Sequence, residues 1–208
     1  MGIVLLVLCA CNDSGSSHPG DGAIDSPHGS IDAPAVDAAM ADVPGGVGEP
    51  AELAGTTLAH NQVRAMVDTT GIAAGPLPPM QWDPNLASLA SAWVSQCQSS
   101  NGQLIDHSST ASRTNVAGYA YVGENIYASG GTATGPDAVA LWASEKQYYT
   151  YATNSCASGQ ICGHYTQVVW RDSIHVGCAI QTCSNVAYPN TVVCNYGPGG
   201  NYGNQQPY

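Results

Sequence analysis

The stretch that decides the fold is Cys162-Gly-His-Tyr-Thr-Gln-Val-Val-Trp170, followed by Val176-Gly-Cys-Ala179 and then by Val193-Cys-Asn-Tyr-Gly-Pro-Gly-Gly-Asn201. Three short runs within and beside it are rich in Val, Ile and aromatic residues and are separated by turn residues: 167–170, 175–181 and 191–196. Runs of this length and composition predict β-strands, and their short connections favour antiparallel pairing. We therefore expect an antiparallel sheet near the end of the chain.

Helical patterns precede these strands. A first helix is expected over residues 51–68, with spaced apolar residues and no Pro or Gly after Thr56. A second begins at Asp83-Pro84, an N-cap followed by proline at the first helical position, and its apolar stripe runs from Leu86 to Cys97. A third starts near Pro136 and places Glu145 on or beside its buried face. Helices followed by strands predict an α+β domain.

Charged residues are scarce and strongly acidic in balance. They make up 9% of the 208 residues, with 4 Lys+Arg against 15 Asp+Glu and a net charge of −11. The sequence therefore has no basic surface with which to neutralise phosphates, and we exclude nucleic acid as a partner. The length allows one domain and a tail.

The beginning of the chain has the character of an export signal. Residues 3–8 are all aliphatic, and the run ends in Leu8-Cys9-Ala10-Cys11. It is too short to span a bilayer and resembles a lipoprotein signal over residues 1–11, with Cys11 as the lipidated residue. A plain secretory signal cleaved nearby is the alternative. We expect a protein of the cell surface, either an outer membrane-anchored lipoprotein or secreted, that meets the membrane only through its lipid anchor.

Between this signal and the domain lies a segment dominated by Asp, Ala, Pro, Gly and Ser. It covers residues 12–50 and cannot bury enough apolar surface to offset its ordering entropy. We expect a disordered, acidic linker there, followed by a domain over residues 51–208.

Six cysteines fall inside the expected domain: Cys97, Cys156, Cys162, Cys178, Cys183 and Cys194. No Cys-x-x-Cys pair occurs, so disulfides explain them better than a structural zinc site. Six cysteines allow fifteen connectivities. Cys178 and Cys194 lie on neighbouring predicted strands and form the firmest pair. Cys97 with Cys162 and Cys156 with Cys183 is one of the arrangements left open for the rest.

The signatures quoted at the outset resemble those of the CAP superfamily, which groups cysteine-rich secretory proteins, antigen 5 and plant pathogenesis-related proteins. Shorter motifs agree in order: His60-Asn61, Trp82-Asp83, Gly123-Glu-Asn-Ile-Tyr127 and Trp142 with Glu145. The chain is thus identified as an SCP-domain bacterial lipoprotein, most similar in its cysteine positions to the plant branch. The resemblance implies a disulfide-stapled, three-layer α-β-α sandwich, and it supports the Cys178–Cys194 bridge.

Carried over residue by residue, the resemblance also implies a cleft tetrad of His107, Glu124, Glu145 and His164. Two imidazoles and two carboxylates are a plausible divalent-metal site, with His107 and His164 as ligands and zinc as the first candidate. Each residue alone could instead be structural.

Three functions remain open from the sequence. The leading one is an extracellular binding or interaction protein whose ligand, a lipid or a protein, is unknown. A metal-assisted hydrolase is the alternative, although neither a His-Glu-x-x-His helix nor a Gly-x-Ser-x-Gly elbow occurs. Sterol or lipid binding, known in the superfamily, is the third.

Overall fold

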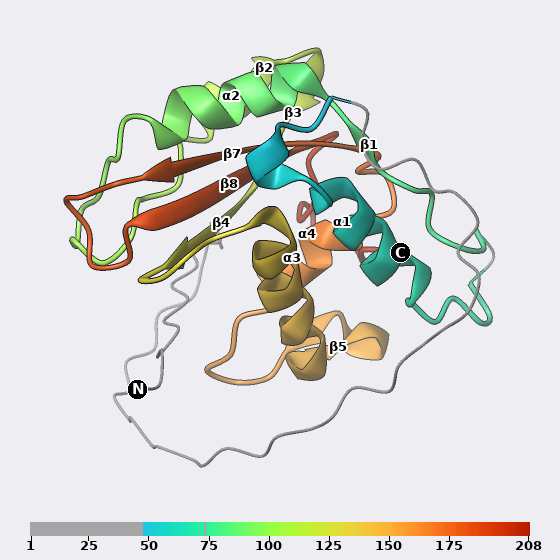
Figure 1. The fold of residues 1–208 in the computed structure, drawn as a ribbon. Helices are drawn as coiled ribbons and strands as arrows, with labels where there is room; N and C mark the ends of the chain where they lie inside the picture. Colours follow the sequence, from blue (N-terminus) through green and yellow to red (C-terminus); the bar gives the residue numbers. More distant parts are fainter. Residues whose placement is uncertain (1–47, 73) are drawn as a thin grey trace.

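The computed structural model describes residues 48–72 and 74–208 (Figure 1). The expected export signal, Cys11 and nearly all of the expected linker lie outside these residues. None of the helices in the described part of the chain has the length and apolar character that a membrane span requires.

The described chain forms a three-layer α-β-α domain of the expected α+β class. Its central sheet has four strands in the order β1-β7-β8-β4, where β1 is Gln81–Trp82, β4 is Gly123–Ser129, β7 is His175–Thr182 and β8 is Asn190–Gly197. Strands β4, β8 and β7 pair antiparallel as expected, whereas β1 joins β7 in parallel. Figure 1 shows α2 on one face of the sheet and α1, α3 and α4 on the other.

Helix α2, Pro84–Val94, begins where the sequence predicts. The Asp83 carboxylate accepts hydrogen bonds from the backbone nitrogens of Asn85 and Leu86, which caps the helix. The buried side chains of the helix pack on β7 and β8. The approach is close: a Cβ added at Gly177 of β7 would lie 2.2 Å from the backbone nitrogen of Ala87. A glycine at this position therefore lets helix and sheet meet.

The first helix on the opposite face is shorter than the sequence predicts. The expected first helix divides into a 3-10 turn, Ala51–Leu53, and α1, Thr56–Ala65, because Gly55 between them adopts a left-handed conformation with φ of 86°. The Glu49 carboxylate accepts hydrogen bonds from the nitrogens of Gly55 and Thr57 at 2.8 and 2.6 Å. Glu49, assigned by sequence to the linker, thus contacts the folded domain.

Helix α3, Gly135–Ser144, starts beside Pro136 as expected, and a 3-10 turn, Glu145–Tyr148, follows it. The predicted strand 167–170 is wrong. Its first residues belong to α4, Gly163–Val168. Every residue from His164 to Trp170 is buried, and a short helix buried on all sides shows no amphipathic period that would separate it from a strand.

Two small hairpins complete the fold. One pairs β2, Thr114–Val116, with β3, Tyr119–Tyr121, and the other pairs β5, Tyr149–Thr150, with β6, Ser155–Cys156. A further 3-10 turn, Ala111–Arg113, leads into β2, and another, Tyr151–Thr153, joins β5 to β6. Neither hairpin was predicted.

The core has two parts, one on each side of the sheet. On β8, Val192, Cys194 and Tyr196 belong to the cluster under α1, α3 and α4, whereas Val193 belongs to the cluster under α2. This alternation follows from the two-residue period of a strand. The sheet is buried on both faces, which leaves its edges and the loops at its ends to build a site.

Three disulfides staple the domain. Cys178 and Cys194 face each other in the β7–β8 register and are bridged, so this predicted pair is confirmed. The other pairings suggested by sequence are wrong: Cys97 bonds to Cys183, and Cys156 bonds to Cys162. The first joins the end of α2 to the end of β7, and the second closes a loop of only 6 residues in sequence separation. The pairing of these four cysteines depends on chain turns, such as the β5–β6 hairpin, that the sequence pattern does not predict.

Candidate functional site

The four candidate residues form two histidine–glutamate pairs. His107 Nδ1 lies 2.7 Å from Glu124 Oε1, and His164 Nδ1 lies 2.5 Å from Glu145 Oε1. Nε2 of either ring makes no hydrogen bond within the described part of the chain. A carboxylate that accepts from Nδ1–H fixes the orientation of the ring and leaves Nε2 as the nitrogen that can face a ligand. The two rings therefore share one hydrogen-bonding arrangement, and it is one that metal-ligating histidines use.

The first pair is built by the loop after α2 and by the edge strand β4. Ser108 donates to both carboxylate oxygens of Glu124, from its backbone nitrogen at 2.9 Å and from its hydroxyl at 2.7 Å. Burial raises the pKa of Glu124, but its hydrogen bonds from His107 and Ser108 and the charge of Arg113 outweigh burial and hold the pKa below its usual value. Glu124 is thus an ionised, fully bonded carboxylate.

Arg113 lines the same part of the structure as the first pair and is held there by hydrogen bonds. Its guanidinium donates to the Tyr121 hydroxyl at 2.9 Å and to the Val122 carbonyl at 3.0 Å, and it lies over the Tyr121 ring. The sequence analysis assigned Arg113 no role, although a residue that is one of only four Lys+Arg in the chain is a signal that could have singled it out.

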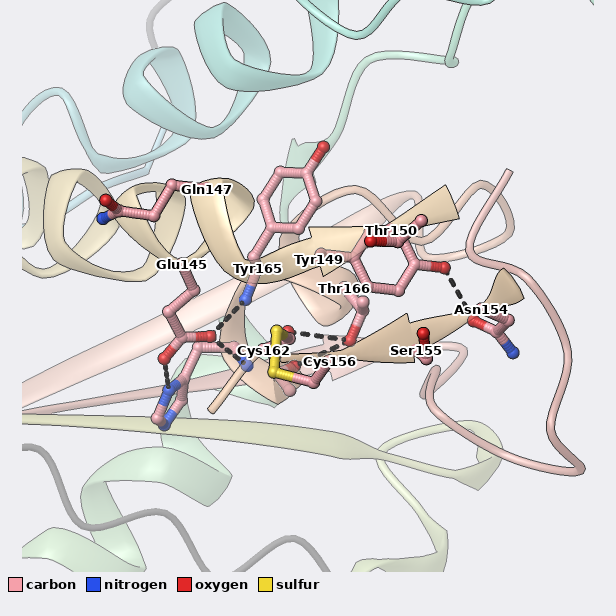
Figure 2. Close-up of a disulfide and its surroundings, with 12 residues drawn as sticks. Glu145, Gln147, Tyr149, Thr150, Asn154, Ser155, Cys156, Cys162, Tyr165 and Thr166 are labelled. Carbon is pink, nitrogen blue, oxygen red and sulfur yellow. Dashed lines mark hydrogen bonds and ion pairs between the residues drawn. A yellow bond between two sulfur atoms is a disulfide. The ribbon is translucent and has the colours of Figure 1, made fainter. Parts of the chain in front are cut away.

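The second pair lies in the core, at the start of α4. Glu145 Oε2 accepts from the backbone nitrogens of His164 and Tyr165, each at 3.0 Å, so the carboxylate also caps the helix (Figure 2). The His164 ring stacks on Trp142 at a centroid distance of 6.1 Å. Its side chain is 2% exposed, against 15% for His107. Glu145 therefore orients His164 from two sides.

A buried network connects the second pair to the sheet. The Asn125 amide donates to the His164 carbonyl and to the Tyr196 hydroxyl, each at 3.1 Å. That hydroxyl lies 3.0 Å from Nε2 of His60, whose Nδ1 lies 2.8 Å from the Thr56 carbonyl. Burial lowers the pKa of His60 to about 4 and raises that of Tyr196 well above its usual value. Both side chains are therefore neutral, and the Tyr196 hydroxyl, which His60 contacts, accepts from the Asn125 amide.

A cavity of about 510 Å³ opens beside the first pair. His107 and Glu124 are among its lining residues, whereas Glu145 and His164 are not. The other walls come from the β2–β3 hairpin, from the segment 154–167 that contains both Cys156 and Cys162, and from residues 200–207. Figure 2 shows the Cys156–Cys162 bridge between the β5–β6 hairpin and the start of α4. The bridge thus holds one rim of the cavity against the helix that carries His164.

The last residues of the described chain are tied to this rim by hydrogen bonds. The Asn154 amide donates to the carbonyls of Asn204 and Gln205, and the Asn201 amide donates to the Gly163 carbonyl at 2.8 Å. These contacts join segments about forty to fifty residues apart in sequence, which a local pattern does not reveal.

Among the described residues, no three His, Cys, Asp or Glu side chains are grouped as ligands of one ion. The expected zinc therefore stays a prediction that rests on the two imidazoles. Asn125 follows Glu124 directly on β4 and bonds to the backbone of His164, so adjacent residues of one strand contact both pairs.

Comparisons with known proteins agree with the fold and its motifs. The "Cysteine-rich secretory protein family" pattern, CAP, matches residues 57–196. Pathogenesis-related protein 1A of Nicotiana tabacum is 41% identical over 151 residues, which cover 72% of this chain and 77% of that protein. Human GLIPR1-like protein 1 is 40% identical over 153 residues, which cover 72% of this chain and 60% of that longer protein.

Solved structures support the same fold. The venom allergen-like protein 4 of Schistosoma mansoni superposes with a TM-score of 0.57 at 24% identity, covering 74% of this chain and 90% of that one. BmVAL-1 superposes with a TM-score of 0.59 at 24% identity, covering 80% of this chain and 86% of that one. With its paired signatures, three disulfides and α-β-α layers, the chain belongs to the cysteine-rich secretory protein (CAP) family.

Proposed function

We propose that this domain is an exported binding module, in which the cavity beside His107 is the ligand site and a divalent ion is held by Nε2 of His107 and of His164. Export is supported by the three disulfides, which form and persist in oxidising compartments. Attachment to the membrane through a lipid on Cys11 is part of the proposal and rests on the sequence of residues 1–11.

The observation that carries the ion site is the hydrogen-bonding arrangement that the two histidines share. Each presents Nδ1 to a carboxylate that is itself held by backbone N–H groups. This second layer of hydrogen bonds is typical of histidines that ligate metals, because it fixes the ring and raises the basicity of Nε2. Two nitrogen donors with open positions suit zinc. When bound, the ion would supply a positive charge at the cavity wall for a ligand oxygen.

Zinc titration by calorimetry tests the ion site. We expect binding at about pH 7.5 that weakens at about pH 5.5, because protonated imidazole cannot ligate. The His107→Ala/His164→Ala double variant should lose it, and Glu145→Gln should weaken it about tenfold to a hundredfold through loss of ring orientation.

His175→Ala is the matched control, since His175 starts β7 and does not line the cavity. Two outcomes would leave the two pairs as structural polar clusters. The wild type could show no detectable zinc binding at about pH 7.5, or the double variant could still bind zinc. The disulfide-held fold of each variant is checked by circular dichroism.

A further inference from the structure

We propose that the cavity beside His107 takes a neutral, hydroxyl-rich ligand, namely a sugar unit of an uncharged glycan. The inference rests on the proposed binding function and names the ligand class for the same site. Three properties of the cavity wall carry it: its two charged side chains, Glu124 and Arg113, already hydrogen-bond within the protein, its free polar groups are amides and a hydroxyl, and an exposed aromatic ring is among its lining residues.

The first property disfavours an ionic ligand at the protein's own side chains. Glu124 is the sole acidic residue in the lining, and both of its oxygens accept hydrogen bonds from the protein. Arg113 is the sole Lys or Arg in the lining, and it is engaged by Tyr121, Val122 and Ser108. Among the lining side chains, a sulfate, phosphate or carboxylate on a ligand would therefore meet only a guanidinium whose terminal nitrogens are already engaged and whose Nε is buried. The proposed ion would be its one other positive partner, so the array is read with zinc present and anionic glycans are included as the competing outcome.

The remaining cations of the chain do not help. The Arg64 guanidinium donates to the backbone carbonyls of Pro78, Val168 and Trp170. The Arg171 guanidinium donates to those of Gly75 and Pro76. Lys146 is not among the lining residues. With 4 Lys+Arg in the whole sequence, no further Lys or Arg can supply a positive charge.

The second property is the kind of polar group left free. The side chains of Thr110, Gln160, Asn204 and Gln205 line the cavity, are exposed, and make no hydrogen bond within the described residues. A primary amide offers two donor hydrogens and an acceptor oxygen, and a threonine hydroxyl both donates and accepts. Sugar hydroxyls need donors and acceptors together, so this set matches them without any net charge. It also disfavours a sterol, whose apolar body would leave these groups unpaired.

The third property is an exposed ring. Tyr202 is 47% exposed, and among the described residues no other aromatic side chain falls in the exposed class. Its ring packs at a centroid distance of 5.3 Å against Trp170, which is also in the lining and is almost fully buried. Trp170 thus packs against Tyr202. An exposed aromatic ring beside free amides fits a pyranose ring, which carries an apolar C–H face edged by hydroxyls.

Binding to an array of immobilised oligosaccharides tests the inference. The protein used is the exported chain, from which the expected export signal, residues 1–11, has been removed, and zinc is present. The array carries uncharged glycans of hexose and N-acetylhexosamine units beside sulfated and sialylated ones. We expect binding to a subset of the uncharged glycans, measured again in solution by calorimetry with the best of them. Binding only to the anionic glycans, or to none of the glycans, would overturn the inference.

Variants then place the ligand. Tyr202→Ala should weaken the affinity about threefold to tenfold through loss of the ring face, and Tyr202→Phe should retain it. Gln205→Ala should weaken it about fivefold through loss of a hydrogen bond. Gln181→Ala on the far end of β7 is the matched control, since Gln181 is exposed and lies outside this cavity. Affinity for the uncharged glycan that is unchanged in Tyr202→Ala and in Gln205→Ala would contradict the assignment.

The outcomes separate this inference from the proposed function. Zinc affinity should be equal in the wild type and in Tyr202→Ala, because Tyr202 is not an expected ligand of the ion. If the cavity instead binds an uncharged peptide or cholesterol in vesicles, and Tyr202→Ala weakens that binding, the binding-module proposal stands and the glycan inference fails. If glycan binding persists in His107→Ala/His164→Ala while zinc binding is absent from the wild type, the inference stands and the ion site fails.

Discussion

Acidification should destabilise this domain through His60, a histidine that is fully buried in the core. Its ring is bracketed by the Thr56 carbonyl and the Tyr196 hydroxyl, and burial lowers its pKa from 6.5 to about 4. In the unfolded chain the same side chain returns to about 6.5. Between these two values the unfolded state binds the proton and the folded state does not, so stability falls as the pH falls through this window.

The magnitude follows from the two pKa values. A shift of one pKa unit corresponds to about 1.4 kcal/mol, and between about pH 7.5 and about pH 4.5 most of the interval from 6.5 to 4 is crossed. We therefore expect His60 alone to remove about 2.5 kcal/mol from the free energy of unfolding over that range. Glu124, whose pKa is held below its usual value, contributes stability that is lost only at more acidic pH, as its carboxylate becomes protonated in the folded state.

Urea unfolding of the oxidised domain at several pH values measures this loss, and His60→Gln isolates it. Glutamine keeps a donor and an acceptor but does not titrate, so the variant should be less stable at about pH 7.5 and yet lose about 2.5 kcal/mol less on acidification. His175→Gln makes the same substitution at a half-buried histidine outside this network and is the matched control. Equal pH dependence in the wild type and in His60→Gln would refute the reasoning.

Two further predictions concern the packing of α2 and the export segment. Gly177→Ala should cost about 3 kcal/mol or more of unfolding free energy, because its Cβ would lie 2.2 to 2.7 Å from backbone atoms at the start of α2 and its cap. Gly130→Ala should be tolerated, because its Cβ would meet only the Tyr188 ring at 4.0 Å. Chemical denaturation of the two variants compares the free energies of unfolding. Cys11→Ala should move the full-length protein from the detergent-extracted membrane fraction to the soluble fraction, and equal fractionation of the two would contradict lipidation.

The sequence by itself determined those features whose signal is local or carried by motifs. The Asp83-Pro84 cap predicted the start of α2 because the cap and the first turn are neighbours in the chain. The Val-, Ile- and aromatic-rich runs 175–181 and 191–196 predicted two neighbouring strands, and with the family resemblance the Cys178–Cys194 bridge, because paired strands place opposite residues in contact. The His107, Glu124, Glu145 and His164 set came from the resemblance to the CAP family, and the tertiary structure joins these residues as two pairs.

The tertiary structure alone decided the features in which long-range contacts override local preference. Strand β4 contains Gly123, Glu124 and Asn125, which are poor strand formers, and it is a strand because it pairs with β8 along its whole length. Helix α4 is buried on all sides and has no period to reveal it. The Cys97–Cys183 and Cys156–Cys162 bridges depend on where the end of α2 and the β5–β6 hairpin come to lie.

The same reasoning separates the two histidines of the site. Sequence assigns them equal roles, yet His107 lines the cavity while His164 stacks on Trp142 in the core. The walls of that cavity come from residues 107 to 207, which only the closed fold brings around one space. Its neutral character is likewise invisible in the sequence, because whether Arg113 and Glu124 are free or engaged depends on partners that folding supplies.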